Sequence, residues 1–273
     1  MFSYQTPINI EQQQKQLKGQ LDSLYNQIQR PRQSAVRKNI LLIGRTRSGK
    51  STLKQMLTDP REVSSELTLF AQTREPRMDI VKIHHSDLTL NLIDTPGLFD
   101  RQYDSNGLLT NDECLRQIRK YCIDIHVTEF HLVCLCLSMH SGINAEDIQA
   151  TRQFIEYFGP RLADHLCMII TRCESKNEGQ RLLLHNEIEH DQDFGPITKQ
   201  FKKGIHFSGA VNLDDWNQAN NAVLLQFNTI CEYRNILLNL IEQSTSSFKI
   251  EPLLITPPLS PVPSNEHSTR KKG

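Results

Sequence analysis

Short apolar runs alternate with amphipathic stretches from about residue 39 to residue 245. The runs have the length and composition of buried strands, and the stretches between them repeat apolar residues at helical spacing. Strands are predicted at residues 40–43, 80–83, 88–93, 130–137, 166–170 and 205–207, and helices at 50–58, 112–123, 144–158, 179–189 and 216–242. Uniformly apolar strands between amphipathic helices imply a mostly parallel six-stranded sheet covered on both faces, so the pattern predicts a three-layer α/β domain.

Two of these segments carry clear boundary signals. Asn144 can cap the helix that follows it, with Asp147 three positions on, and Gly159 stands just past the helix end. Ser86 and Asp87 are predicted to form the turn of a hairpin that joins the strands at 80–83 and 88–93.

A separate helix is predicted before this domain. Its apolar residues share one stripe, and they are Ile10, Leu17, Leu21, Leu24 and Ile28. Asn9 could cap this helix and Pro31 would end it, while Gln14 occupies a position on the seam. The stripe is too short to distinguish a coiled-coil contact from packing against the chain's own core.

The composition changes after Ser246 to proline, serine and threonine, followed by a basic end. Such a segment cannot offset its own ordering entropy, and we expect it to be disordered. Residues 258–261 fit P-x-x-P and could bind an SH3-type partner, although an inert tail is the simpler interpretation. The predicted regions are therefore an N-terminal helix and linker at 1–37, a central domain at 38–245 and a tail at 246–273.

Charge and cysteine content narrow the function classes. The 31 basic residues balance 31 acidic residues, which gives no global attraction to nucleic acid. Seven cysteines without a C-x-x-C pair favour buried thiols in a reducing compartment over disulfides or a zinc site. No stretch has the apolar length of a transmembrane segment and no signal peptide is recognisable, so we expect a cytoplasmic protein.

The strongest chemical signal follows the first predicted strand of the domain. Residues 44–51 read G-R-T-R-S-G-K-S and fit G-x4-G-K-[ST], in which backbone amides surround a β-phosphate. Lys50 would bridge the β- and γ-phosphates, and the Ser51 hydroxyl would bind Mg²⁺. The candidate phosphate-binding residues are Gly44, Arg45, Thr46, Arg47, Ser48, Gly49, Lys50, Ser51 and Thr52.

A second motif, Asp94-Thr95-Pro96-Gly97, follows the strand at 88–93. The Asp94 carboxylate could hold Mg²⁺ through water, and Gly97 could offer its N–H to a γ-phosphate. Between the two motifs, a polar segment at 58–76 can supply a threonine to the metal. Thr73 and Thr68 are the candidates, and Thr73 is preferred as a metal-binding and catalytic residue because it stands just before the hairpin.

Two later loops are candidates for reading the base. Residues 171–174 read Thr-Arg-Cys-Glu, and the Glu174 carboxylate could accept hydrogen bonds from the N1–H and exocyclic amine of guanine. Ser208, Gly209 and Ala210 follow the last strand with small side chains that let a backbone N–H approach the base. The candidate base-reading residues are Thr171, Arg172, Glu174, Ser208, Gly209 and Ala210.

With these motifs, the chain resembles the avirulence-induced-gene type GTPases, which include the GTPases of immunity-associated proteins and are related to the Toc GTPases and septins. The resemblance covers roughly residues 38–243 and includes the apolar segment 132–137 with the helix after it. It implies the strand order of a Ras-like G domain, GTP and Mg²⁺ as ligands, and nucleotide-dependent dimerisation. It also implies that Thr-Arg-x-Glu is the guanine-reading motif of the family.

One position bears on hydrolysis. Ras-type enzymes carry a glutamine directly after the switch glycine, whereas this chain has Leu98. We therefore expect slow intrinsic hydrolysis that a dimer partner stimulates, with Arg116 or Arg119 as candidate sources of positive charge. The alternatives are a nucleotide-gated scaffold without turnover and an ATP-using P-loop kinase or ATPase. His185 to His190 matches no metal-site spacing, and a solvated helix face is the simpler interpretation.

Overall fold

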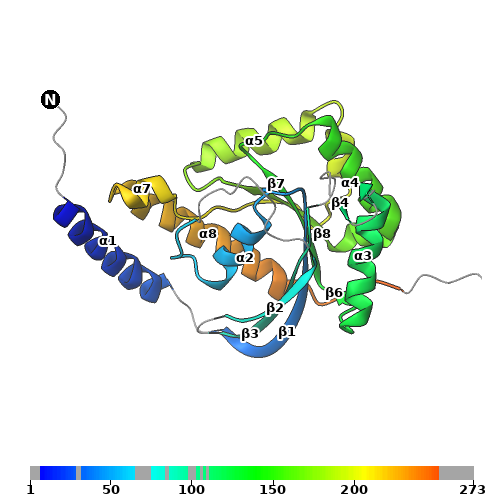
Figure 1. The fold of residues 1–273 in the computed structure, drawn as a ribbon, viewed down its shortest axis with the longest axis horizontal. Coiled ribbons are helices and arrows are strands. Elements are labelled where there is room, and N and C mark those ends of the chain that lie inside the picture. Colours follow the sequence, from blue (N-terminus) through cyan, green and yellow to red (C-terminus); the bar gives the residue numbers. More distant parts are fainter. Residues whose placement is uncertain are drawn as a thin grey trace, which may run out of the picture.

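A six-stranded sheet forms the centre of the protein in the computed structural model (Figure 1). The structure describes residues 7–28, 32–64, 75–83, 86–97, 103–104, 107–108 and 111–251. The sheet strands are β1 (Arg32–Ile43), β2 (Arg77–Lys82), β3 (Ser86–Asp94), β7 (Leu132–Ser138), β8 (Leu166–Thr171) and β9 (Ile205–Phe207). Their order is β2-β3-β1-β7-β8-β9, and only the edge strand β2 runs antiparallel to its neighbour.

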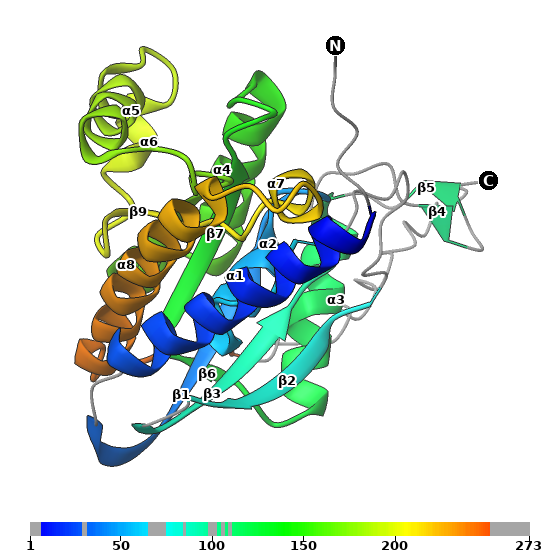
Figure 2. The same ribbon diagram turned by 90° about the vertical axis from the view of Figure 1, so that its left-hand side faces the viewer.

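Helices cover both faces of this sheet. They are α1 (Pro7–Ile28), α2 (Lys50–Thr58), α3 (Asn111–Asp124), α4 (Ala145–Phe158), α5 (Glu178–His190), α6 (Gly195–Thr198), α7 (Leu213–Asn217), α8 (Ala222–Gln243) and the 3-10 helix η1 (Pro160–His165). Figures 1 and 2 show α1, α2 and α8 on one face and α3 and α4 on the other. The predicted three-layer, mostly parallel, Ras-like α/β fold is therefore confirmed.

The inner strands owe their position to their side chains. Every residue of β7 and of β8 is buried, as expected for parallel strands that are covered on both faces. All seven cysteines are buried free thiols, and Cys134 and Cys167 lie on paired strands with their sulfur atoms 3.5 Å apart. This confirms the interpretation of the cysteines as small buried residues.

The predicted boundary of α4 is confirmed in atomic detail. The Asn144 side chain accepts from the Asp147 N–H at 3.0 Å, and the Asp147 carboxylate accepts from the Asn144 N–H at 3.1 Å. Gly159 follows the helix with φ of 82°, a left-handed value that disfavours other residues. These contacts fix where α4 begins and ends.

Helix α1 packs against the chain's own core. Leu17, Leu21 and Tyr25 are buried, and the helix contacts α8 and α7. Gln14 donates from Nε2 to the Trp216 carbonyl at 3.0 Å. Arg61 lies over the Tyr25 ring, with its guanidinium carbon 4.6 Å from the ring centroid. Of the two alternatives for the apolar stripe, the structure therefore has intramolecular packing.

Three predicted boundaries are wrong. Helix α1 begins at Pro7, so Asn9 lies within the first turn and does not cap it. Ser86 and Asp87 belong to β3 rather than to a turn, because pairing with β1 extends the strand to Arg32 and Ser86. Strand β1 consequently begins before residue 38, inside the region assigned to the N-terminal linker.

The predicted closing helix 216–242 is interrupted. Helix α7 ends at Asn217 and α8 begins at Ala222. Asn220 sits in the interruption, where its side chain donates to the Asp215 carboxylate at 2.9 Å and accepts from the Ala222 N–H at 2.9 Å. Such local side-chain bonds compete with helical backbone bonds and divide the segment in two.

Short strands lie beside the main sheet. They are β4 (Tyr103–Asp104), β5 (Gly107–Leu108), β6 (Glu129–Phe130) and β10 (Phe248–Lys249). Strand β10 pairs antiparallel with β6, so the first residues of the predicted tail take part in the fold. The rest of that prediction, including the proline motif, falls on residues 252–273, outside the described residues. Within the described residues no helix has the length and apolar character required to span a bilayer.

Candidate functional site

The phosphate-loop candidate lies between β1 and α2, at the carboxyl edge of the sheet. Strand β1 ends at Ile43 and α2 begins at Lys50, so residues 44–49 form the loop. Gly49 precedes α2 with φ of 87° and gives it no side-chain cap. No side chain at that position therefore caps the N–H groups of the first helical turn. In other proteins, uncapped N–H groups at a helix N-terminus bind phosphate.

Two glycines of this loop are required by close contacts as well as by backbone angles. A Cβ on Gly44 would lie 2.4 Å from the Cys136 carbonyl oxygen, and one on Gly49 would lie 2.5 Å from Thr171 Oγ1. Both glycines have positive φ, 147° and 87°. The motif glycines therefore hold the loop against β7 and β8.

Lys50 folds back over the loop. Its ammonium donates to the Gly44 carbonyl at 2.8 Å and to the Arg45 carbonyl at 2.9 Å. The residue is 6% exposed, an unusual degree of burial for a lysine. These bonds keep the charge of Lys50 at the mouth of the loop.

Ser51 and Asp94 meet at the start of α2, as the sequence predicts for a metal site. Ser51 Oγ donates to Asp94 Oδ2 at 3.3 Å. Asp94 is buried, and its Oδ1 has no hydrogen-bond partner among the described residues. Burial raises the pKa of Asp94, while the nearby charges of Lys50 and Lys54 and the bond from Ser51 oppose that rise.

This donor set fits Mg²⁺. A hydroxyl and a carboxylate are hard oxygen donors, and the buried Oδ1 of Asp94 leaves an acceptor to be satisfied. The candidate threonines Thr73 and Thr68 lie outside the described residues, as does Leu98. Gly97 is buried at the end of the segment after β3, and the Thr95 hydroxyl donates to the Leu42 carbonyl at 2.8 Å.

Thr171 has a structural role that the sequence did not reveal. Its hydroxyl donates to the Ser48 carbonyl at 2.8 Å and lies 3.3 Å from the Leu137 carbonyl. The residue is fully buried, at 0% exposure. Thr171 therefore joins the loop at 171–174 to the phosphate loop from behind, with its side chain directed at protein backbone.

Glu174 lies against the other candidate base loop. Burial raises the pKa of Glu174, while the nearby backbone N–H groups of Glu174 itself and of Ala210, together with the charges of His140 and Arg172, counteract part of the rise. A Cβ on Gly209 would lie 2.6 Å from Glu174 Oε2, which explains the glycine.

The remaining predicted base-loop residues serve different contacts. The Cys173 N–H donates to the Ser208 carbonyl at 3.0 Å and so joins the two loops, while the buried Ser208 hydroxyl lies 3.5 Å from Met56 Sδ. Arg172 has φ of 63°, and its Nη1 is 3.4 Å from His140 Nδ1. Thr52 lies in the first turn of α2.

His140 and the partners of Arg45 are site residues that sequence patterns missed. A cavity of about 370 Å³ lies beside the phosphate loop, and its lining includes Arg45, Thr46, Arg47, Ser48, His140 and Arg172. Arg45 pairs with Glu146 at 3.1 Å and with Asp147 at 3.6 Å. Its Nη1 is also 3.4 Å from Asn144 Oδ1. The phosphate loop is thereby attached to the start of α4.

The two candidate arginines of α3 face different surroundings. Arg116 is 53% exposed and pairs with Glu113 at 2.8 Å. Arg119 donates to the Glu251 carbonyl at 2.6 Å, and its guanidinium carbon is 5.5 Å from the centroid of the Tyr157 ring. Those partners belong to the C-terminal end of α4 and the segment after β10, so Arg119 is directed away from the phosphate loop.

The histidines of α5 form local contacts. His185 Nδ1 is 3.3 Å from Glu189 Oε2, and His190 Nδ1 is 2.8 Å from the Asn186 carbonyl. No group of three or more metal-binding side chains occurs in the part of the chain that the structure describes. The interpretation of this stretch as a solvated helix face agrees with these contacts.

Comparisons with known proteins place the site in a family context. The model of the AIG1 family matches residues 38–205, more than half of the 273 residues. Immune-associated nucleotide-binding protein 4 of Arabidopsis thaliana is 31% identical over 134 residues, which cover 49% of this chain and 39% of that protein. Immune-associated nucleotide-binding protein 7 of the same organism is 29% identical over 138 residues, which cover 49% of this chain and 40% of that protein. The matched region thus spans about two fifths of these relatives.

Solved structures similar to this fold include Toc33 from Arabidopsis thaliana in complex with GDP and Mg²⁺. The TM-score is 0.49 at 15% identity, covering 88% of this chain and 96% of Toc33. Toc33 in complex with Mg²⁺ and GMPPNP gives a TM-score of 0.48 at 14% identity, covering 90% and 97%.

Proposed function

Because this chain belongs to the AIG1 family, we propose that it is a GTP-binding switch protein that hydrolyses GTP slowly and dimerises through its nucleotide face. The arrangement of Lys50, Ser51 and Asp94 around one loop carries this proposal. It combines a buried ammonium with a hydroxyl and carboxylate pair that suits Mg²⁺. The similarity to immune-associated nucleotide-binding proteins supports the same ligand class.

Phosphate binding follows from the loop's backbone and charge. The amides at the start of α2 would face the β-phosphate. The Lys50 ammonium would leave the carbonyls of Gly44 and Arg45 and bind the β- and γ-phosphates instead. Ser51 and Asp94 would hold Mg²⁺, which when bound neutralises negative charge on the phosphates. These residues bind and orient the triphosphate, and the proposed role of Thr73 is to complete the metal site when GTP is present.

Guanine selection is assigned to Glu174. Its carboxylate lies near the backbone N–H of Ala210, and its lone pairs can accept from the N1–H and amine of guanine. Adenine presents a different edge and would leave the half-buried carboxylate without donors from the base. Arg172, Gly209 and Ala210 would frame the base, while Thr171 and Ser208 would act by holding the two loops together.

Slow hydrolysis rests on Leu98, which stands where Ras-type enzymes place a water-orienting glutamine. A second molecule facing the nucleotide could supply the missing charge. Arg116 is the better placed of the two α3 candidates, because it is exposed whereas Arg119 is bound to the Glu251 carbonyl. We also propose a cytosolic location, which the seven buried free thiols support.

Nucleotide binding tests the core of this proposal. Fluorescent GDP should bind in the presence of Mg²⁺, GTP should displace it, and ATP should fail to displace it at a hundredfold excess. Displacement by ATP at equal concentration would instead favour the ATP-using P-loop kinase or ATPase.

Hydrolysis and assembly require separate measurements. The mass in solution should rise with a non-hydrolysable GTP analogue and not with GDP, and single-turnover phosphate release should accelerate with protein concentration. Tight GTP binding without phosphate release over hours would favour the alternative, a nucleotide-gated scaffold that does not turn over.

A further inference from the structure

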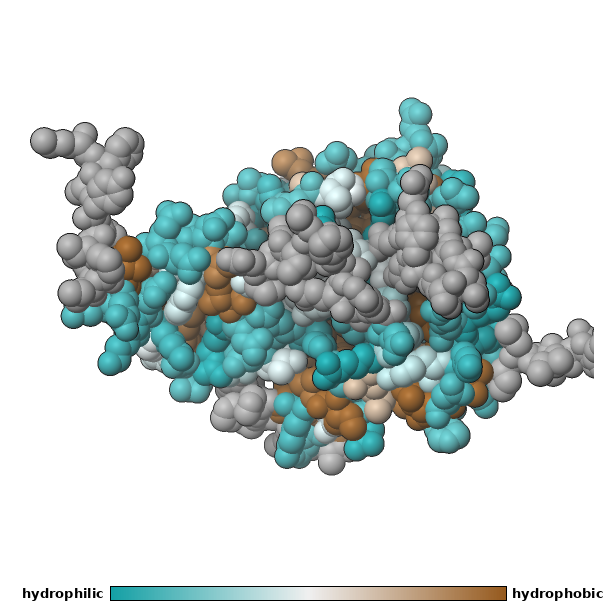
Figure 3. Space-filling model, in the orientation of Figure 1, coloured by the Kyte–Doolittle hydropathy of each residue, from teal (hydrophilic) through white to brown (hydrophobic). Residues whose placement is uncertain are grey.

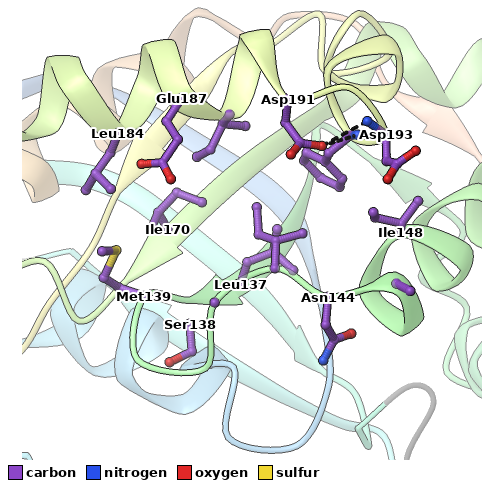
Figure 4. A pocket seen from close by; sticks show the side chains of 15 residues that line it. Leu137, Ser138, Met139, Asn144, Ile148, Ile170, Leu184, Glu187, Asp191 and Asp193 are labelled. Carbon is purple, nitrogen blue, oxygen red and sulfur yellow. Dashed lines mark hydrogen bonds between the residues drawn. The ribbon is translucent and has the colours of Figure 1, made fainter.

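A second cavity lies on the other side of the β7–α4 loop, between α4 and α5 (Figure 4). Its volume is about 360 Å³, within the range of sites that hold ligands or partner side chains. The carboxyl ends of β7 and β8 form its base. It shares Leu137, Ser138 and Asn144 with the cavity beside the phosphate loop, but it contains none of the residues assigned to nucleotide or metal.

The floor of this cavity is apolar. Leu137 and Ile170 come from the two strands, Ile148 comes from α4, and Leu184 comes from α5, with Phe194 just before α6. Figure 4 shows these elements on three sides of the space. An apolar side chain of a partner would therefore be enclosed by aliphatic and aromatic carbon.

The rim is acidic. Glu187, Asp191 and Asp193 line the cavity, and none of the fifteen lining residues is lysine, arginine or histidine. Asp191 is held by the N–H groups of Asp193 at 3.0 Å and Phe194 at 2.7 Å. The nearby Arg152 donates to the backbone carbonyl of Asp193 at 3.3 Å, not to a carboxylate. The rim thus favours a cationic occupant and disfavours an anionic one.

Exposed leucine extends the apolar surface outward from the rim. Leu183 is 69% exposed and precedes Glu187 by four residues, which places both on the same side of α5. Figure 3 shows hydrophobic surface at the upper margin, where α5 lies in Figure 1. A ligand confined to the cavity would leave this surface uncovered, whereas a peptide would cover it.

We propose that the cavity between α4 and α5 docks a segment of a partner protein in which one or two apolar side chains are flanked by lysine or arginine. The apolar side chains fill the cavity, and the basic residues face Glu187 and Asp193. Such a division between a buried apolar centre and a polar rim is typical of peptide-recognition sites. The proposal is independent of nucleotide chemistry, because no residue assigned to phosphate, metal or base lines the cavity.

Peptides of matched size test this proposal with the full chain. The basic probe is Gly-Lys-Phe-Leu-Arg-Gly with blocked ends, and the acidic control replaces its lysine and arginine with glutamate. Calorimetric titration should detect the basic probe and show affinity at least about tenfold weaker for the acidic one. Amide chemical shifts should move at Ile148, Leu184 and Glu187 when the basic probe is added.

Two variants block the site without touching the core. Ala145 is an exposed lining residue, so Ala145→Phe fills the mouth of the cavity, and Glu187→Lys with Asp193→Lys reverses the rim. Each should weaken the basic probe about tenfold or more. Glu189→Lys reverses a charge on α5 outside the cavity lining and should leave the affinity unchanged. Thermal unfolding of every variant establishes that it is folded.

Several results would overturn the proposal. Undetectable binding of the basic probe, equal binding of both peptides, or equal loss in Glu189→Lys and the site variants would each do so. If hexylammonium, tested alone, binds in a manner that Ala145→Phe abolishes while the basic probe does not bind, the cavity serves a small cationic ligand instead.

Discussion

Thr171 donates a hydrogen bond from Oγ1 to the carbonyl oxygen of Ser48 over 2.8 Å, and so joins the loop at 171–174 to the phosphate loop. The same hydroxyl lies 2.5 Å from where a Cβ on Gly49 would be. One buried side chain thus sets both the spacing of two loops and the need for glycine in one of them. The two loops should respond together when either is changed.

Replacing Thr171 with valine should uncouple the loops. The substitution keeps the shape of the side chain but leaves the buried Ser48 carbonyl without its donor, at a cost of about 1–3 kcal/mol in the free energy of unfolding. Urea unfolding should show this loss, and GDP affinity should fall with it. Thr229→Val removes an exposed hydroxyl bond to the Leu225 carbonyl and should change stability by less than about 0.5 kcal/mol. Equal effects of the two variants would contradict the prediction.

Glu174→Ala should relax base selection by about a hundredfold or more, because a site that hydrogen-bonds its ligand discriminates strongly through those bonds. Competition of GDP against ADP measures the ratio. In the free protein the pKa of Glu174 is raised, chiefly by burial, and guanine requires the ionised form. The preference should therefore be complete above the raised pKa and decline as the pH falls through it. In Glu174→Gln the ratio should show no such pH dependence.

Asp94→Asn should stabilise the nucleotide-free protein while weakening Mg²⁺-dependent nucleotide binding about tenfold or more. Burial raises the pKa of Asp94 above its unfolded value, so the folded state binds this proton more readily. The contribution to stability is then greatest below the unfolded pKa and declines as the pH rises through the folded pKa. Asparagine cannot ionise, so the variant does not lose stability as the pH rises. Its melting temperature should therefore exceed that of the unmodified protein at neutral pH, and the difference should vanish in acid.

Asp79→Asn is the matched control for that measurement. The Asp79 carboxylate pairs with Lys54 at 2.8 Å and with Arg77 at 3.2 Å, and losing its charge removes two ion pairs rather than a buried unpaired oxygen. This variant should lower the melting temperature slightly or leave it unchanged. A rise in both variants would show that general loss of negative charge, not the burial of Asp94, is responsible.

Helix α1 offers a test of intramolecular packing. Leu21→Ala should lower the free energy of unfolding by about 2–5 kcal/mol, because Leu21 is 2% exposed between α1 and the core. Gly19→Ala should raise it by about 0.5–1 kcal/mol, since Gly19 lies on the exposed side and its added Cβ would meet nothing within 4 Å. If Leu21→Ala has no effect in denaturant unfolding, α1 does not stabilise the domain.

Local signals explain what could be predicted from the sequence. Residues close together in the sequence determine the apolar strands β7 and β8 and the capping pair Asn144 and Asp147, and the structure contains all of them. The phosphate loop is also a local pattern with fixed spacing, and its residues do come together with Asp94.

Contacts between distant residues could not be predicted in this way. Thr171 and Ser48 are 123 positions apart in the sequence, and β10 and β6 are separated by more than a hundred residues. No sequence periodicity predicts either contact. The interruption at Asn220 was missed because Trp216 and Val223, on either side of a polar run, are seven residues apart and so keep helical spacing, while the side-chain bonds of Asn220 favour a break. The ion pairs of Arg45 with Glu146 and Asp147 could not be predicted either, because they depend on how α4 packs beside the phosphate loop.

Helix α4 connects the phosphate loop, through Arg45, to a distant part of the fold. Fourteen residues at 1.5 Å per residue make a rod of about 21 Å. Its first turn is tied to the phosphate loop through Arg45 and Asp147, and at its last residue Phe158 packs edge-on against Phe248, with ring centroids 6.1 Å apart. A packed helix moves as a rigid body. If a ligand bound at the phosphate loop tilts the first turn of α4, the contact between Phe158 and Phe248 at the other end of the helix should move as well.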